Sequence, residues 1–179
     1  MIEILRSIAL SALTLSGGTA LGQSATEYEI YPTPQKSEYK QSSFKITESV
    51  NIVYERGIDQ YTKNRLEKIL KKSNIAFKIV AKPTRGKTNI LVGINQSGEL
   101  VDQYFNKHIP HKETFFDKND SHIVSVNSNV IAVIGNHTDS AFFGITTLKH
   151  VFNQLENSQI SEFRIDDFSN VKHRGFIEG

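Results

Sequence analysis

Two aspartates that follow one another, Asp166 and Asp167, are the most suggestive chemical pair in the sequence. Adjacent carboxyl groups can move each other's pKa values apart, so that one holds a proton while the other accepts one, as an acid–base catalyst requires. The surrounding polar sequence, Asp-Asp-Phe-Ser-Asn, is instead typical of a solvated loop. We therefore favour two loop carboxylates over a local catalytic pair.

Two further motifs contain residue types that bind metals or phosphate. His108 and His111 are spaced like metal ligands, but Pro110 prevents a regular helix across them and no third ligand lies nearby in the sequence. Gly86-Lys87-Thr88 is similar to the end of a phosphate-binding loop, which needs a glycine five positions earlier, where this chain has Ala81. We predict no metal site, no cofactor and no complete active site.

The composition excludes several classes of function. The chain has 179 residues, 38% of them hydrophobic and 22% charged, which is enough to build a core and unlike a disordered tail. The 21 basic and 19 acidic residues give a net charge of +2, too balanced for a nucleic-acid groove or a strongly basic membrane patch. The absence of cysteine rules out disulfides, thiolate metal sites and a cysteine nucleophile.

The N-terminal region resembles a secretory signal. A short apolar run at residues 7–15 follows Arg6, and small residues follow it up to an Ala20-x-Gly22 pattern. The run is shorter than the roughly 20 residues of a membrane-spanning helix, so we predict no membrane span. We assign residues 1–22 to a signal peptide and 23–27 to a linker, and predict a secreted protein.

Periodicity predicts three helices and several short strands. The helices are expected at residues 59–72, 98–106 and 140–155, with Thr138 or Asp139 as the cap of the last one. A hairpin is expected across the polar turn at residues 127–129. The segment from Tyr28 is also strand-like. The other strands are predicted at 36–39, 43–46, 50–54, 76–80, 89–94, 122–126, 130–134, 162–165 and 171–179.

This order of elements predicts an α+β fold: a mixed β-sheet with about three helices packed mainly on one face. The apolar faces of the helices at 59–72 and 140–155 would form that helical layer. We assign residues 28–170 to this domain. Residues 171–179 read as a strand without a polar tail, and we expect them to open a second domain.

Four ordered motifs resemble bacterial family 84 glycoside hydrolases, the β-N-acetylglucosaminidases that include O-GlcNAc-removing enzymes and proteins called hyaluronidases. Residues 173–179, His-Arg-Gly-Phe-Ile-Glu-Gly, resemble the first strand of their catalytic barrel. Residues 28–35, 87–94 and 139–150 resemble, in turn, their opening strand, central strand and long helix. The likeness runs from Tyr28 to Gly179.

The resemblance implies an N-terminal domain followed, at residues 171–179, by the start of a (β/α)8 barrel. It implies a retaining, substrate-assisted enzyme that removes terminal β-linked N-acetylglucosamine, including O-GlcNAc, from glycans and glycoproteins. The catalytic Asp pair would lie beyond position 179, so we expect no catalytic residue in this chain and no activity of the chain alone. The carbonyl of Gly179 would accept a hydrogen bond from a sugar hydroxyl, because a residue without Cβ lets the ring come close.

Two alternatives remain open at this stage. The chain could be an independent carbohydrate-binding or adhesion module, although it has no Trp and its six Tyr are dispersed. It could also be the N-terminal domain of a family 20 hexosaminidase, which has a similar layout. In the favoured interpretation the domain packs on the barrel within one polypeptide.

Overall fold

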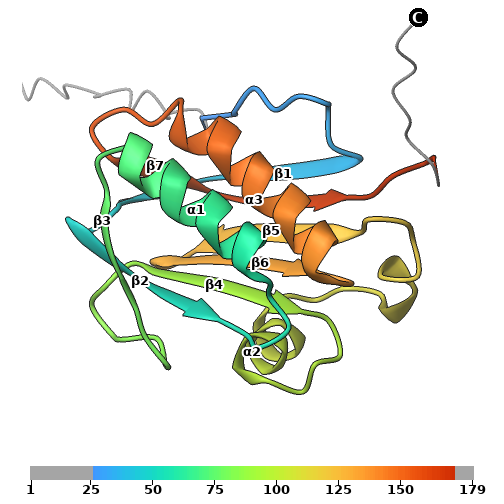
Figure 1. The fold of residues 1–179 in the computed structure, drawn as a ribbon. Helices are drawn as coiled ribbons and strands as arrows, with labels where there is room; N and C mark the ends of the chain where they lie inside the picture. The colour runs from blue at the N-terminus through green and yellow to red at the C-terminus, as the bar shows by residue number, and fades with distance from the viewer. Residues whose placement is uncertain (1–25, 172–179) are drawn as a thin grey trace, which may run out of the picture.

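The computed structural model describes residues 26–171, which form one seven-stranded sheet with helices on both faces (Figure 1). The elements are β1 (Lys36–Lys45), β2 (Ser49–Tyr54), α1 (Gln60–Lys72), β3 (Ala76–Ile79), β4 (Asn89–Ile94), α2 (Leu100–His108), a 3-10 turn (Glu113–Phe115), β5 (His122–Asn127), β6 (Val130–Gly135), α3 (Thr138–Phe152) and β7 (Gln159–Asp167).

The sheet has an antiparallel half and a parallel half. Its strand order is β1-β7-β5-β6-β4-β2-β3. Neighbours from β1 to β6 run antiparallel, and neighbours from β6 to β3 run parallel. Parallel neighbours need a crossover, and α1 supplies the one between β2 and β3. The predicted mixed α+β sheet is confirmed.

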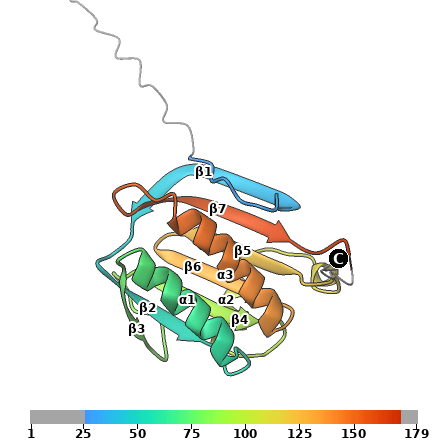
Figure 2. The same cartoon turned by 45° about the horizontal axis from the view of Figure 1, so that its top comes forward.

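Two helices cover one face of this sheet and the third covers the other. Helices α1 and α3 lie side by side in front of the sheet, and α2 lies behind it (Figures 1 and 2). The central strand β4 is apolar on both sides: Ile90 and Val92 pack in the core with α1 and α3, whereas Leu91 packs with α2. The predicted helical layer of the first and third helices is therefore confirmed, and α2 closes a second, smaller core.

Helix α1 begins where the sequence predicts because Asp59 caps it. The Thr62 backbone N–H donates to the Asp59 Oδ1 at 2.7 Å, and Leu66 and Leu70 then point into the core. Helix α3 differs from its prediction at both ends. Its cap is His137, whose Nδ1 accepts from the Ser140 N–H at 3.3 Å, and the helix ends at Phe152 rather than 155.

The N-terminal strands also differ from the prediction. The runs at 36–39 and 43–46 form one strand, β1, with a register shift between Tyr39 and Ser43. Residues 28–31, predicted to be strand-like, are not in a strand. Tyr28 is nevertheless buried, because its hydroxyl accepts a hydrogen bond from the Ser161 N–H at 2.9 Å and its ring packs edge-on against Phe163.

The hairpin forms as predicted. Strands β5 and β6 pair in register, and the turn residues Ser128 and Asn129 have φ values of 48° and 67°. These left-handed conformations are the ones that a tight hairpin turn requires, and Asn tolerates them well. The strand predicted at 171–179 lies outside the described residues apart from Val171.

Candidate functional site

A cleft of about 240 Å³ lies at the end of β7, where the described chain finishes. Its walls are the segment around Tyr31, the outer side of α3 with Phe143 and His150, and the stretch from Asp167 to Val171. Carboxyl, imidazole and hydroxyl groups, which are able to do acid–base chemistry, line it.

A buried imidazole and a carboxylate line this cleft. His122 is 3% exposed, and its Nε2 lies 4.0 Å from Oδ2 of Asp167, its register partner on β7. The other ring nitrogen, Nδ1, lies 2.9 Å from the Asp120 carbonyl oxygen. Asp167 Oδ1 accepts from the Gln35 and Phe168 N–H groups at 3.2 and 2.9 Å. These bonds fasten the ends of β5 and β7 to the loops beside them.

Ser169 also lines the cleft, so that Ser, His and Asp are all present in it. A nucleophilic serine needs its hydroxyl to donate to the imidazole. Here the Ser169 hydroxyl donates instead to the Val171 carbonyl at 2.7 Å, and its N–H donates to the Asn119 carbonyl at 2.8 Å. This geometry is that of a loop anchor and not of a catalytic triad.

His150 is the second histidine of the cleft, on the outer side of α3. Burial lowers its pKa, and the neighbouring charges of Lys149 and Arg65 lower it further. The neutral form of the imidazole is therefore favoured at this wall of the cleft.

The structure separates the two aspartates of the sequence motif. Asp166 and Asp167 follow one another on β7, and successive side chains of a strand point to opposite faces of a sheet. Asp167 faces the cleft, whereas both oxygens of Asp166 accept from Arg164, at 2.6 and 2.9 Å. The two carboxylates therefore do not face one another, and they lie at the end of a strand and not in the loop that the sequence predicts.

The metal and phosphate motifs form no site either. The His111 ring lies edge-on against the Phe116 ring. The centroid of the His108 ring lies 4.7 Å from the centroid of the Tyr104 ring. The Thr88 hydroxyl accepts from the Thr47 N–H at 3.1 Å and is fully buried, so it is not available to a phosphate-bound cation. No group of three or more His, Cys, Asp or Glu residues in the 26–171 range is arranged to hold a metal ion.

Sequence reasoning missed a pair of buried carboxylates at the start of α2. Glu55 and Asp102 are 3% and 4% exposed. Glu55 accepts from the Ile94 N–H at 2.7 Å, the Asp102 N–H at 2.8 Å and the Ser97 hydroxyl at 3.0 Å. Asp102 in turn accepts from the N–H groups of residues 96 and 98 at 3.0 and 2.9 Å. Every oxygen is occupied, so the pair is structural.

The substrate-binding residue proposed from the resemblance, Gly179, lies outside the described residues. The same is true of the predicted signal peptide at 1–22. None of the helices within residues 26–171 has the length and apolar character needed to span a membrane.

Comparison with known families decides what kind of domain this is. Residues 27–168 match the family described as glycosyl hydrolase family 20, domain 2. The chain belongs to this family. It is thus a domain of the hexosaminidase type, and its parent class is the glycoside hydrolases.

Solved structures show which proteins contain a similar domain. It superposes on a structure named CpGH84D with a TM-score of 0.83 and 47% sequence identity over 86% of this chain, supporting the resemblance to family 84. It also superposes on CpGH84B (TM-score 0.61, 21% identity, 79% of this chain) and on a β-N-acetylhexosaminidase from Bacteroides fragilis (0.53, 18%, 80%), which share the fold. The resemblance to an N-terminal hexosaminidase domain is confirmed.

The hexosaminidase-type domain is only part of each of these proteins. The chain spans 26% of CpGH84D, 22% of CpGH84B and 25% of the Bacteroides enzyme.

Proposed function

We propose that the chain is the accessory N-terminal domain of a secreted, retaining β-N-acetylglucosaminidase that acts on terminal β-linked N-acetylglucosamine, including O-GlcNAc. The observation that carries this proposal is the 47% identity with CpGH84D over 86% of the chain. The carboxylates of residues 26–171 support the proposal indirectly. Those that could be considered as a catalytic acid or base contact Arg164, His122 or backbone N–H groups instead. Acid and base would come from the barrel.

The proposed chemistry is substrate-assisted. The acetamido oxygen of the sugar attacks C1 and the C1–O bond to the aglycone breaks, giving an oxazoline. One Asp of the barrel orients and polarises the acetamido N–H. A second gives its proton to the leaving oxygen and then takes a proton from the water that opens the oxazoline.

The first experiment compares the 179-residue chain with a polypeptide extended through the barrel on an aryl β-N-acetylglucosaminide. We expect turnover from the extended protein only. Turnover by the 179-residue chain would overturn the proposed division of labour. Binding of that chain to a glycan array would instead support the alternative of an independent binding module.

A second experiment tests the mechanism in the extended protein. Replacing the N-acetyl group by mono-, di- and trifluoroacetyl groups weakens the attacking oxygen, so kcat/KM should fall progressively along the series. NMR should show the β-anomer as the first product. An initial α-anomer, or no dependence on fluorination, would contradict substrate assistance.

Gly179 is proposed to offer its carbonyl to a sugar hydroxyl, on the strength of the sequence resemblance alone. In the extended protein Gly179→Ala should raise KM more than it lowers kcat, because an added Cβ would crowd the bound ring in ground and transition states alike. An unchanged KM would remove this assignment.

Secretion is proposed from the apolar run and the small residues that follow it. Protein recovered from the culture medium should begin at residue 23 or close to residue 26 when its N-terminus is sequenced. Retention of residue 1 in a cell-associated protein would contradict the signal peptide.

A further inference from the structure

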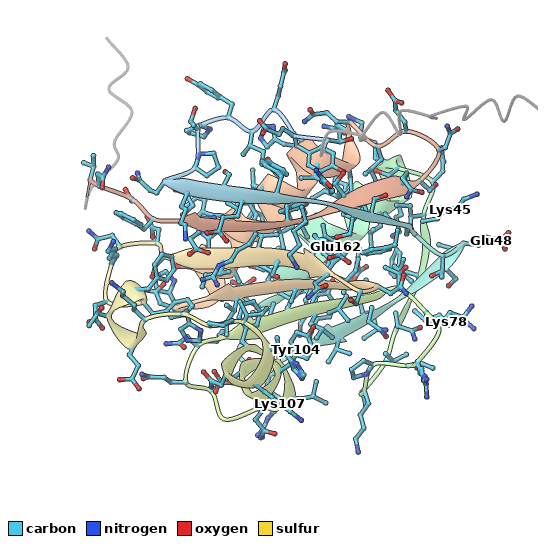
Figure 3. The ribbon with its side chains drawn as sticks, turned by 180° about the vertical axis from the view of Figure 1, so that it is seen from behind. Lys45, Glu48, Lys78, Tyr104, Lys107 and Glu162 are labelled. Carbon is cyan, nitrogen blue, oxygen red and sulfur yellow. The ribbon has the colours of Figure 1, made fainter. Side chains whose placement is uncertain are left out.

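A groove lies on the side of the sheet that carries α2. Its larger part is a cavity of about 520 Å³ between strands β1 and β7 and the segment 110–118. Its smaller part, of about 180 Å³, lies against α2, and Glu38, Pro110 and Arg164 line both parts. Figure 3 shows this side of the molecule, with Tyr104 of α2 and Glu162 of β7 labelled. We call the two parts together the α2-side groove; the larger part alone has a size typical of a small-ligand site, roughly 300–1,000 Å³.

Paired charges form the floor of this groove. Glu38 on β1 lies opposite Arg164 on β7, and Lys36 lies opposite Asp166. The Arg164 guanidinium donates to both oxygens of Asp166, at 2.6 and 2.9 Å, and also to the Pro110 carbonyl. The Lys36 ammonium lies 2.6 Å from Glu38 Oε1. The two positive and two negative charges therefore balance, and each nitrogen of the guanidinium already has an acceptor.

Two lysines of the larger cavity are not balanced in this way. Lys112 and Lys118 line it and are exposed, and neither forms an ion pair within residues 26–171. Lys40, in the smaller part, is by contrast paired with Glu162 at 3.5 Å. The Lys118 ammonium lies 3.6 Å from the centroid of the Phe168 ring, a cation–π contact that positions it without neutralising its charge. This end of the groove therefore carries a surplus of positive charge that complements an anion.

The same cavity offers an aromatic ring and a hydrogen-bond acceptor. The Phe115 ring lines it and is held edge-on by the rings of Phe116 and Phe168, at centroid distances of 5.1 and 6.2 Å. His111 Nδ1 lies 2.9 Å from the Ile109 carbonyl oxygen. Because a carbonyl oxygen can only accept, Nδ1 carries the proton, and Nε2 of the neutral ring is left as an acceptor. The cavity can therefore accept a hydrogen bond from a hydroxyl group as well as bind an anion.

This combination of groups favours a saccharide over a polypeptide or a nucleic acid. The groove lies on a face of the sheet, where the backbone groups of β1 and β7 pair with each other, so a peptide backbone would find no strand to pair with. A row of phosphates would meet the carboxylates of Glu38 and Asp166 as well as the two lysines. A sugar brings hydroxyl groups for the acceptors and a ring face for Phe115, and an acidic sugar also brings a carboxylate for the lysines.

We propose that the α2-side groove binds an acidic saccharide, with carboxylate groups at Lys112 and Lys118 and a sugar ring against Phe115. The inference goes beyond the proposed function, because this site would tether the protein to carboxylate-bearing glycans and takes no part in the cleavage of a glycosidic bond. It requires no residue outside the described part of the chain, so it can be tested on the 179-residue chain.

An NMR titration with trigalacturonic acid, which has one carboxylate on each ring, tests this directly. Backbone amide signals of residues 110–118 and of β7 should shift on binding, and those of α1 should not. The methyl ester of the same trisaccharide keeps the rings but has no charge, and it should bind at least about fivefold more weakly, since an exposed ion pair contributes up to about 1 kcal/mol. Added sodium chloride should weaken the binding of the acid and not that of the ester.

Charge-removing variants locate the carboxylates. Lys112→Gln and Lys118→Gln should each weaken binding of the acid about two- to fivefold, and the double variant should approach the affinity of the ester. Both side chains are exposed, so the unfolding midpoint in urea should not move. Lys78→Gln removes the same charge from the exposed edge strand β3 (Figure 3) and is the matched control, with unchanged affinity. An equal loss of affinity in Lys78→Gln would overturn the assignment to the groove.

Three further outcomes would overturn the proposal. These are equal affinities for the acid and its ester, no binding at about 10 mM acid, where even a millimolar site is occupied, and equally tight binding of a capped triglutamate peptide, which has as many carboxylates. The proposed function is decided separately, by turnover in the extended polypeptide. Binding together with that turnover supports both proposals, whereas binding without it supports the groove and contradicts the proposed function.

Discussion

The carboxylate of Glu55 accepts a hydrogen bond from the backbone N–H of Asp102 at 2.8 Å, across 47 residues of sequence. This bond ties the end of β2 to the first turn of α2, where N–H groups lack partners within the helix. The same carboxylate lies so close to Gly93 that a Cβ there would be 2.6 Å from Glu55 Oε2. The second core under α2 therefore depends on a buried acid and a glycine that makes room for it.

Replacing Glu55 by Ala should destabilise the domain strongly, because the partly buried N–H of Ile94 and the buried N–H of Asp102 lose their acceptor. The expected loss is about 2–4 kcal/mol in the free energy of unfolding, measured by urea titration. The stability of Glu55→Gln should lie between that of Glu55→Ala and that of the unmodified protein, since one amide oxygen remains to accept a hydrogen bond. Glu48→Ala, a change at an exposed acid (Figure 3), is the control and should lie within about 0.5 kcal/mol of the unmodified protein.

Asp59 should matter as the cap of α1 and in a pH-dependent way. The hydrogen bond from the Thr62 N–H is the main cause that lowers its pKa, so the ionised form stabilises the folded state above the unfolded pKa near 3.8. This contribution should disappear as the pH falls through the folded pKa. Asp59→Ala should cost about 1 kcal/mol at neutral pH and remove that acid dependence. Asp59→Asn should keep most of the stability that the cap provides but should lose its dependence on acid pH. Equal losses of stability in Asp59→Ala and Asp59→Asn would contradict a capping role.

His150 should make the domain less stable in mild acid. Burial lowers its pKa below 6.5, so the unfolded chain takes up a proton more readily, and the free energy of unfolding should decrease as the pH falls through 6.5. Thermal unfolding at several pH values above about 5, where Asp59 is still ionised, isolates this effect. His150→Gln should flatten the slope, and Lys149→Gln should reduce it only in part because burial is the larger cause. If the dependence of the unfolding free energy on pH is unchanged in His150→Gln, this explanation is wrong.

Tyr28 should act through its hydroxyl rather than through β pairing. Tyr28→Phe keeps the ring against Phe163 but leaves the buried Ser161 N–H without its acceptor, at a cost of about 1–3 kcal/mol. The exposed Tyr61→Phe is the matched control, and its unfolding midpoint in urea should not move. If both variants unfold at the same midpoint, the Tyr28 hydroxyl has no structural role.

Local patterns predicted the elements that local forces determine. The apolar spacing of Leu66, Ile69 and Leu70 placed α1, and the β-branched runs around Ser128 and Asn129 placed the hairpin, because in each case the deciding contacts are close in sequence. The apolar face expected of the helix at 140–155 is buried for the same reason, at Ala141, Ile145 and Leu148. Capping by His137 was missed because histidine is an unusual cap residue.

The features that were missed depend on residues far apart in sequence. Glu55 looks like an ordinary polar residue after a strand until Asp102 and Ile94 are placed beside it. Tyr28 lies in a strand-like run that finds no strand partner, so tertiary context overrides its propensity. The stacking of Tyr61 on Phe142 could not be predicted because the two rings come from different helices, and only the packing of α1 on α3 brings them together.

The pairing of β1 with β7 sets an order of events during synthesis. Lys36 of β1 lies opposite Asp166 of β7. Strand β1 therefore cannot form its hydrogen bonds with β7 until nearly the whole domain has left the ribosome. Closing so long a loop is slow compared with forming a hairpin such as β5–β6. A nascent chain stalled before β7 should therefore expose β1 to chaperones, and one stalled after it should resist protease.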